Sequence, residues 1–247
     1  MLLLDLNTLN ALDFLTNSLF ITLEEFKYKL LHITDNIIGK EFPFEGCVIA
    51  GGALLNLIKN ETFNINSDID IWITGKYNNK KIYMSNILNY LSKFNCKFIQ
   101  YTETIVNVIL PNKIIIQIIN TLYKNPITII NMFDLDIVKM YYDGKNVYLT
   151  PTCVKSICNN TIINSENFII EDENKYYNFN KNTGLTLPVK YYRIKKYIER
   201  GYNFDCKFIN NKESKSSNNC IINAKISDTE NVLNKKYYDL LMNQTIV

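Results

Sequence analysis

Histidine and tryptophan are almost absent from this sequence, which contains one of each, His32 and Trp72. Its six cysteines are scattered along the chain, and no two of them form a C-x-x-C pair. Structural zinc sites are built from clustered Cys and His side chains, so the sequence does not predict a zinc site. Scattered free thiols favour a reducing compartment instead.

Long apolar runs are also missing, and no segment of the sequence is apolar for long enough to span a bilayer. The N-terminal residues Met1–Asp5 become acidic too early for a signal peptide. Both features predict a cytosolic or nuclear protein that has no membrane partner. Charge of one sign is weak as well: the net charge of +3 favours a polyanionic partner such as RNA only slightly.

The most informative stretch is Val48–Ile73, in which an apolar run, a glycine pair, a helix-like segment and an apolar strand follow one another. The glycines are Gly51 and Gly52, and the strand contains Asp68 and Asp70. Side chains alternate between the two faces of a strand, so both carboxylates are expected on one face, opposite the isoleucines of the same strand.

Two carboxylates on one face suit Mg²⁺, which binds hard oxygen ligands together with substrate phosphates. Gly51 and Gly52 allow a sharp turn and a close approach of the backbone to a ligand. The helix that follows offers free N–H groups to an anion. These features predict a site for a metal-bound triphosphate; the alternative is a surface strand with two solvated aspartates.

An apolar-Gly-Gly turn, a helix and an Asp-x-Asp strand together resemble the nucleotidyltransferase superfamily typified by DNA polymerase beta, poly(A) polymerase and the tRNA CCA-adding enzymes. The resemblance implies that Asp68 and Asp70 bind Mg²⁺ or Mn²⁺ and that Gly51 and Gly52 shape the phosphate-binding turn. It also implies transfer of a nucleoside monophosphate from an NTP to an acceptor hydroxyl, for example an RNA 3′ end or tRNA, with release of pyrophosphate. The segment between the glycines and the aspartates is longer here than in the superfamily.

A third metal-binding carboxylate of the superfamily lies on a later strand, where this sequence has Gln117. The run from Gln117 through Pro126 to Phe133-Asp134 resembles a branch of the superfamily found in large DNA viruses and some phages. In that branch the Gln and the Phe-Asp pair occur together. Asp134 is therefore the candidate third catalytic carboxylate and metal ligand, with Gln117 orienting ligands or substrate. The alternative is that Asp134 braces the sheet.

The two arginines of the chain, Arg193 and Arg200, lie with Lys196 at helical spacing in a segment predicted as a helix from Pro188 to about Arg200. Arginine presents a planar fork that suits phosphate geometry. The pattern Arg-x-x-Lys-Tyr-x-x-Arg-Gly also resembles the viral and phage branch. These three side chains are the candidates for nucleotide binding on this helix, and the alternative is a solvated basic face.

The fold class expected from these segments is α/β or α+β, with a mixed, mostly antiparallel sheet and helices on one face. We expect N-terminal helices over 1–45, a nucleotidyltransferase-like core over 46–158 and a mainly helical C-terminal region over 159–247. That region contains the basic helix, a low-complexity loop over 210–219 and a last helix over about 228–242. In the N-terminal region, Thr22 and Glu25 match a capping box that predicts a helix from Leu23. A polar loop is expected over 60–66, Trp72 is expected in the core, and Asp143 is expected in a structural turn with Gly144. Phe133–Gly144 is expected to form a strand that ends in a turn, with Asp134 and Asp136 on one face.

Three possibilities remain open at this point: two functions, and a purely structural protein that binds no nucleotide. The first is a nucleotidyltransferase that uses Mg²⁺ or Mn²⁺ and an NTP. The second is a catalytically inactive module that binds nucleotide or nucleic acid on the same fold, an alternative suggested by Gln117 at the third carboxylate position. A viral protein of this kind is expected in the host cytoplasm or in a virus factory.

Overall fold

The computed structural model describes residues 3–11, 19–59, 67–102, 104–163, 168–172, 175–180 and 185–205. Contacts divide the chain into two compact units, the first comprising 1–133 and 138–153, the second 134–137 and 154–247. In the part of the chain that is described, no helix is both long and apolar enough to cross a bilayer.

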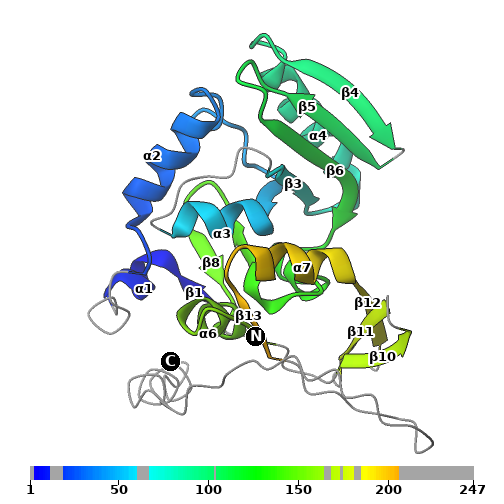
Figure 1. Ribbon diagram of the computed structural model, residues 1–247. Helices are drawn as coiled ribbons and strands as arrows, with labels where there is room; N and C mark the ends of the chain where they lie inside the picture. Colours follow the sequence, from blue (N-terminus) through cyan, green and yellow to red (C-terminus); the bar gives the residue numbers. More distant parts are fainter. Residues whose placement is uncertain are drawn as a thin grey trace, which may run out of the picture. The chain divides into compact units, whose positions relative to one another are not determined.

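The first unit is built on one sheet of eight strands in the order β1-β8-β7-β2-β3-β6-β5-β4 (Figure 1). Its only parallel pair is β3 with β6; all the other neighbours are antiparallel. This arrangement confirms the predicted mixed, mostly antiparallel α/β fold. The strands of the sheet are β1 (Leu4–Asp5), β2 (Cys47–Ala50), β3 (Ile69–Thr74), β4 (Lys97–Thr102), β5 (Ile105–Ile109), β6 (Ile115–Tyr123), β7 (Met140–Tyr142) and β8 (Val147–Leu149).

Helices of the first unit follow the apolar periodicity of the sequence. They are α1 (Leu6–Ala11), α2 (Leu23–Ile33), α3 (Gly52–Ile58), the 3₁₀ turn η2 (Tyr77–Asn79), α4 (Lys80–Leu91) and α5 (Pro126–Asn131), and α6 (Pro151–Cys158) begins in this unit. The predicted helix after Thr22 forms, and it ends near Ile33 because Asp35 and Asn36 adopt positive φ angles. Residues like these two break a helix because their short polar side chains favour the left-handed conformation.

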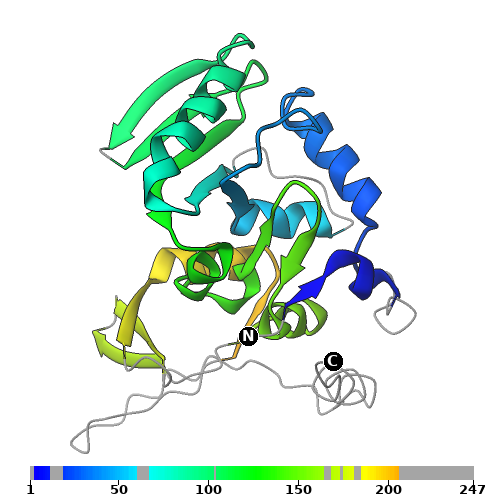
Figure 2. The same ribbon diagram turned by 180° about the vertical axis from the view of Figure 1, so that it is seen from behind.

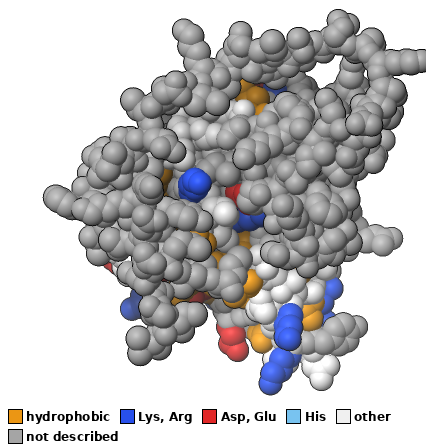
Figure 3. Space-filling view, turned by 90° about the horizontal axis from the view of Figure 1, so that it is seen from below, with side chains coloured by type: hydrophobic (Ala, Val, Ile, Leu, Met, Phe, Trp, Pro, Cys, Tyr) orange, Lys and Arg blue, Asp and Glu red, His pale blue; other side chains and the backbone are white. Residues whose placement is uncertain are grey.

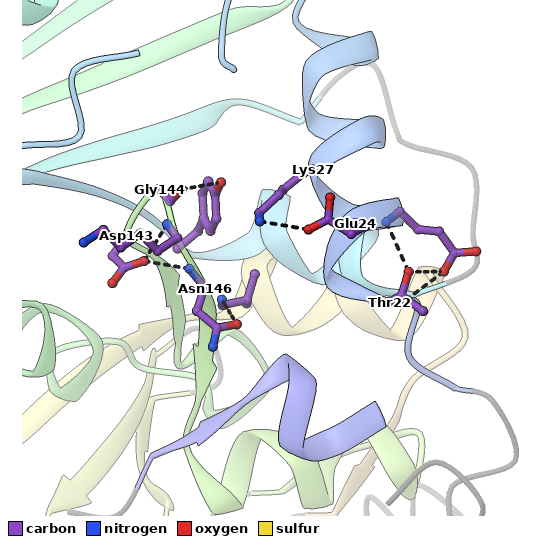
Figure 4. A network of polar contacts seen from close by, with 10 residues as sticks. Thr22, Glu24, Lys27, Asp143, Gly144 and Asn146 are labelled. Carbon is purple, nitrogen blue, oxygen red and sulfur yellow. Dashed lines mark hydrogen bonds and ion pairs between the residues drawn. The ribbon is translucent and has the colours of Figure 1, made fainter. Parts of the chain in front are cut away.

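Two local polar motifs fix the ends of elements in this unit (Figure 4). At the start of α2, the Thr22 side chain accepts a hydrogen bond from the Glu25 N–H, and the Glu25 carboxylate accepts one from the Thr22 N–H. This is the capping box expected from the sequence. Between β7 and β8, Asp143 Oδ1 accepts hydrogen bonds from the N–H groups of Lys145 and Asn146, so Asp143 has the structural role predicted for it.

The two faces of β3 differ as the alternation predicts. Ile69, Ile71 and Ile73 are fully buried, whereas Asp70 and Trp72 are partly exposed. In Figure 2, α4 lies across strands β4–β6. Because Ile69, Ile71 and their register partners in β6 are fully buried, we place the helix-covered core on their face. Asp70 therefore lies on the opposite, more open face.

Helix α5 packs on the face that carries Trp72. Ile129 and Ile130 of α5 form a buried cluster with Val48, Ala50 and Tyr141, and Trp72, Tyr123 and Phe133 pack against it. Val48 and Trp72 are register partners in adjacent strands, so they share this face. One helix thus covers part of the open face, next to Asp70, so the expectation that the helices lie on one face of the sheet is wrong.

The second unit contains more strand than the sequence predicts. Its elements are η3 (Asp136–Val138), which begins in this unit, the end of α6, β9 (Thr161–Ile163), β10 (Phe168–Asp172), β11 (Lys175–Asn180), β12 (Leu185–Lys190), α7 (Tyr191–Glu199) and β13 (Asn203–Asp205). Strands β10–β12 form an antiparallel sheet, and β13 pairs with β9 in parallel. The described part of 159–205 is therefore not mainly helical.

Two further expectations are wrong. Pro188 does not start the basic helix; it lies in the edge strand β12, where a missing N–H is tolerated, and the helix begins at Tyr191. Phe133–Lys139 is not a strand, because η3 intervenes and strand β7 starts only at Met140. Asp134 and Asp136 are both buried and do not alternate along a strand. The predicted helices around residues 12–18 and 228–242, and the loops over 60–66 and 210–219, lie outside the described residues.

Candidate functional site

Asp68, Asp70 and Gln117 come together on the open face of the first unit. Asp70 and Gln117 are register partners in β3 and β6. Gln117 Nε2 donates a hydrogen bond of 3.3 Å to Asp68 Oδ2, which places Asp68 on the same face. Asp68 is exposed and Asp70 is partly exposed, so both carboxylates are accessible to solvent. The predicted placement of the two aspartates on one face is what the fold produces.

Gly51 is the turn that brings backbone to this acidic pair. Its φ of 104° and ψ of −155° lie in a region that is essentially restricted to glycine. A Cβ at this position would lie 3.4 Å from Asp70 Oδ2 and 3.8 Å from the Phe133 ring. The turn is held by the Gly51 N–H, which donates to the Met140 carbonyl of β7. Gly51 therefore lies against Asp70, as predicted, and Gly52 opens the short helix α3.

Asn56 is a positioning residue that the sequence analysis missed. It lies on α3, is buried, and its Nδ2 donates a 3.3 Å hydrogen bond to Ser67 Oγ, the residue before Asp68. This contact ties the helix that follows the glycine turn to the start of the aspartate strand. The signal was present in the sequence, since Asn56 interrupts an otherwise apolar helix, Gly52–Ile58.

Aromatic rings flank the acidic pair on the side of α5. The Trp72 ring lies 5.6 Å from that of Phe133 and 5.5 Å from that of Tyr123, centroid to centroid. Because Trp72 follows Asp70 by two residues in β3, its ring and the Asp70 carboxylate share a face. The sequence indicated a core role for Trp72, and its packing against the α5 cluster is consistent with that role.

In the second unit, the predicted third carboxylate, Asp134, is paired with the predicted phosphate ligand Arg193. The Arg193 guanidinium donates to Asp134 Oδ1 at 2.5 Å. Burial raises the pKa of Asp134 above its ordinary value, and the Arg193 charge and hydrogen bond partly offset that rise. The Arg193 charge compensates the carboxylate charge of the buried Asp134. The role of Asp134 as a metal ligand stays a prediction.

The remaining cations of α7 lie on the exposed side of an amphipathic helix. Ile194, Tyr197 and Tyr202 are buried, Lys196 is exposed and Arg200 is half-buried. The Arg200 guanidinium lies over the Tyr197 ring, 5.4 Å from its centroid. Lys196 on α7 and Arg200, one residue beyond its end, thus form a short basic strip. On the face shown in Figure 3, the visible Lys and Arg side chains of the described residues lie in separate groups.

The donor set at the acidic pair suits a divalent cation that brings further ligands with it. It offers carboxylate oxygens from Asp68 and Asp70, and Gln117 contributes an amide carbonyl oxygen beside them. Within the described ranges, no three His, Cys, Asp or Glu side chains are grouped as metal ligands. A cation here would therefore need oxygens from a bound ligand such as phosphates to complete its coordination.

Comparison with known proteins gives a family match over the first unit. Residues 24–160, more than half of the 247-residue chain, match a family described as "Gabija anti-defense 2 family protein". The chain is also 25% identical over 224 residues to an uncharacterized protein of Acanthamoeba polyphaga mimivirus. That match covers 76% of this chain and 41% of the viral protein, so the chain spans less than half of its relative.

Solved structures of CCA-adding enzymes resemble the chain at low sequence identity. The Thermotoga maritima enzyme complexed with tRNA is 15% identical, with a TM-score of 0.40, and covers 66% of this chain and 36% of its own. A CCA-adding enzyme in complex with CTP is 16% identical, with a TM-score of 0.43 and the same coverage. CCA-adding enzymes are also among the proteins that the glycine and aspartate motifs of this sequence resemble.

Proposed function

Since the chain belongs to the Gabija anti-defense 2 family, we propose that it counters Gabija defence, and that it does so as a metal-dependent nucleotidyltransferase. The reaction would transfer a nucleoside monophosphate from an NTP to an acceptor hydroxyl and release pyrophosphate. The observation that carries the proposal is the meeting of Asp68, Asp70 and the Gly51 turn on the open face of the sheet.

Each residue of this site has a part in the proposed reaction. Asp68 and Asp70 would hold Mg²⁺ or Mn²⁺, which on binding would neutralise phosphate charge and activate the attacking oxygen. Gly51 keeps a side chain away from the space beside Asp70, so that a triphosphate approaches the backbone. Gln117 fixes the Asp68 carboxylate through its Nε2–H and leaves its carbonyl oxygen for a ligand. Catalysis of this kind rests mainly on positioning and on charge stabilisation.

The side chains of the second unit enter the proposal as phosphate ligands. Within the second unit, Lys196 on α7 and Arg200 directly after it would bind phosphate groups, whether of a nucleotide or of a nucleic acid such as RNA or tRNA. Arg193 would do so only in competition with Asp134, which it already contacts.

A second candidate function is a module that binds nucleotide without turnover and blocks a defence component by binding alone. Gln117 favours it, because an amide replaces the carboxylate expected at the third metal-binding position and takes up no proton from an acceptor hydroxyl at neutral pH. The two functions differ in whether the carboxylates must act on an NTP.

An infection assay separates the two functions. The chain is expressed in bacteria that carry Gabija, which are then challenged with a phage that Gabija restricts. Asp68→Asn/Asp70→Asn protein runs beside the wild type, with Asp143→Asn, a change in the β7–β8 turn, as the control. If the protein acts as an enzyme, the wild type and Asp143→Asn raise the number of plaques, and the double variant does not. A folded double variant that protects the phage as well as the wild type does would refute the enzymatic proposal and support binding alone. A wild-type protein that does not protect the phage would refute the anti-defence role.

A further inference from the structure

Two buried polar atoms of the described residues have no hydrogen-bond partner, and both lie on the open sheet face near the acidic pair. They are Trp72 Nε1 and Asn107 Oδ1. Trp72 follows Asp70 by two residues in β3, and Asn107 is the register partner of Gln117 in the neighbouring strand β5. Natural proteins rarely leave such atoms unpaired, so each requires an explanation.

Asn107 extends a row of polar side chains that begins at the acidic pair. The register runs from Asp70 in β3 to Gln117 in β6 and Asn107 in β5. Adjacent strands lie about 4.8 Å apart, so Asn107 lies about 10 Å across the sheet from Asp70. A nucleotide whose phosphates lie at the carboxylates has its ribose and base at about such a distance, which brings Asn107 within reach of the nucleoside.

The surroundings of Asn107 are apolar apart from Gln117. Its register partner in β4 is Ile99, which is exposed, and its same-face neighbours along β5 are Ile105 and Ile109. Gln117 Nε2 donates to Asp68 Oδ2, and the Asn107 oxygen has no hydrogen-bond partner. Isoleucine side chains provide a flat apolar surface, and a single unpaired acceptor among them gives that surface one polar requirement.

Asn107 is partly exposed, although its Oδ1 is buried in this structure. We propose that Asn107 is a specificity-determining residue whose Oδ1 turns toward a bound nucleotide and accepts a hydrogen bond from its nucleoside part. This inference rests on the proposed nucleotide site at Asp68 and Asp70. The donor is either an exocyclic amino group of the base or a ribose hydroxyl, and both provide the chemistry that the buried oxygen lacks. A buried polar group that is built to meet a ligand donor discriminates strongly against analogues without one, because it is then left unpaired.

The test is equilibrium dialysis of nucleotides with Mg²⁺, which measures binding without turnover. The pairs ATP and ITP, and CTP and UTP, differ in the exocyclic amino group, whereas ATP and 2′-deoxy-ATP or 3′-deoxy-ATP differ in a ribose hydroxyl. We expect a preference of at least tenfold in either the base pairs or the ribose pairs. In the base pairs, the wild-type protein would favour the nucleotide with the exocyclic amino group; in the ribose pairs, it would favour ATP. Equal affinity within every pair would overturn the inference, whatever the variants do.

Variants at Asn107 assign that preference to its side chain. Asn107→Leu has a similar size but no acceptor, so it is expected to lose the preference and to bind both members of the pair equally. Asn107→Asp keeps acceptor oxygens and should keep the preference. Asn86→Leu, at an exposed position on α4, is the matched control. Retention of the full preference by Asn107→Leu would overturn the inference.

Failure of the inference and failure of the proposed function give different results. Wild-type binding that is lost in Asp68→Asn/Asp70→Asn, with no effect of Asn107→Leu, overturns the role of Asn107 and leaves the site intact. No binding of any nucleotide by the wild type overturns both. An unliganded Asn107→Leu protein should also melt at a higher temperature than the wild type, because the unpaired oxygen is removed, and a lower melting temperature would contradict that account.

Discussion

Replacing Gln117 with glutamate changes one atom of the side chain and reverses its interaction with Asp68. In the wild type, Gln117 Nε2 donates to Asp68 Oδ2 over 3.3 Å. In the variant, two carboxylates face each other at about that distance. Their repulsion is about 1 kcal/mol at the dielectric constant of water and about 5 kcal/mol at an effective value of ~20. Asp68 is exposed, so the smaller figure applies.

The lost hydrogen bond to a charged acceptor adds about 1.5 kcal/mol, which gives a total destabilisation of about 2.5 kcal/mol. For a chain of this size, such a loss lowers the melting temperature by about 5–10 °C. Carboxylates that repel each other hold protons to higher pH, so the difference between variant and wild type should shrink as the pH falls into the acid range. A divalent cation between them would remove the repulsion, so Mg²⁺ or Mn²⁺ should raise the melting temperature of Gln117→Glu more than that of the wild type.

Thermal unfolding of both proteins at several pH values, with and without Mg²⁺, measures these effects. Asn120→Asp adds a charge to the same strand, β6, at a position for which no contact with Asp68 is found, and serves as the control. A melting temperature for Gln117→Glu equal to that of the wild type at neutral pH would refute the geometry at Asp68. A loss that divalent cations do not reduce would refute the metal site.

Three further predictions concern single residues. Gly51→Ala should be destabilised by about 1–3 kcal/mol because of the φ and ψ of Gly51, and it should lose activity. Gly201→Ala, also at positive φ but with open space around it, should keep activity. An active Gly51→Ala enzyme would contradict the role of the turn. Asn56→Ala should lower stability by about 1 kcal/mol through loss of its bond to Ser67 and should weaken Mg²⁺-dependent nucleotide binding, and unchanged binding in dialysis would exclude a positioning role. Arg193→Met should be destabilised by about 2 kcal/mol at neutral pH, since Asp134 keeps its buried charge without its partner. Burial holds the pKa of Asp134 above 3.8, so Arg193→Met should lose little stability well below pH 3.8, where Asp134 is neutral, and more as the pH rises and Asp134 ionises. Denaturant unfolding that gives the same loss of stability at every pH would contradict this account.

The acidic pair and its strand were predictable because the signal is local. Alternation of isoleucine and aspartate determines which face each side chain takes, and a strand buried on one face keeps that register. The glycine turn was predictable for the same reason: the backbone conformation at Gly51 is restricted to glycine, so the position is marked by a glycine in the sequence.

The contacts that the sequence did not reveal are those between distant segments. The Arg193–Asp134 pair joins residues 59 positions apart, and each was assigned separately to phosphate or metal. Strand β12 was not predicted because an edge strand of a small sheet tolerates residues, such as Pro188, that also start helices. Asn107 was missed because the sequence does not show that this single polar residue of an apolar strand lies beside Gln117 in the sheet.

Pyrophosphate release is the most direct test of the central proposal that Asp68 and Asp70 act on a nucleoside triphosphate. Purified protein is incubated with Mg²⁺ or Mn²⁺, each α-labelled NTP in turn and total cellular RNA, beside folded Asp68→Asn/Asp70→Asn protein. The account predicts metal-dependent release of pyrophosphate and transfer of label to an acceptor, both abolished in the double variant. Release that persists in the double variant, or an absence of release from the wild type with every NTP, would contradict it.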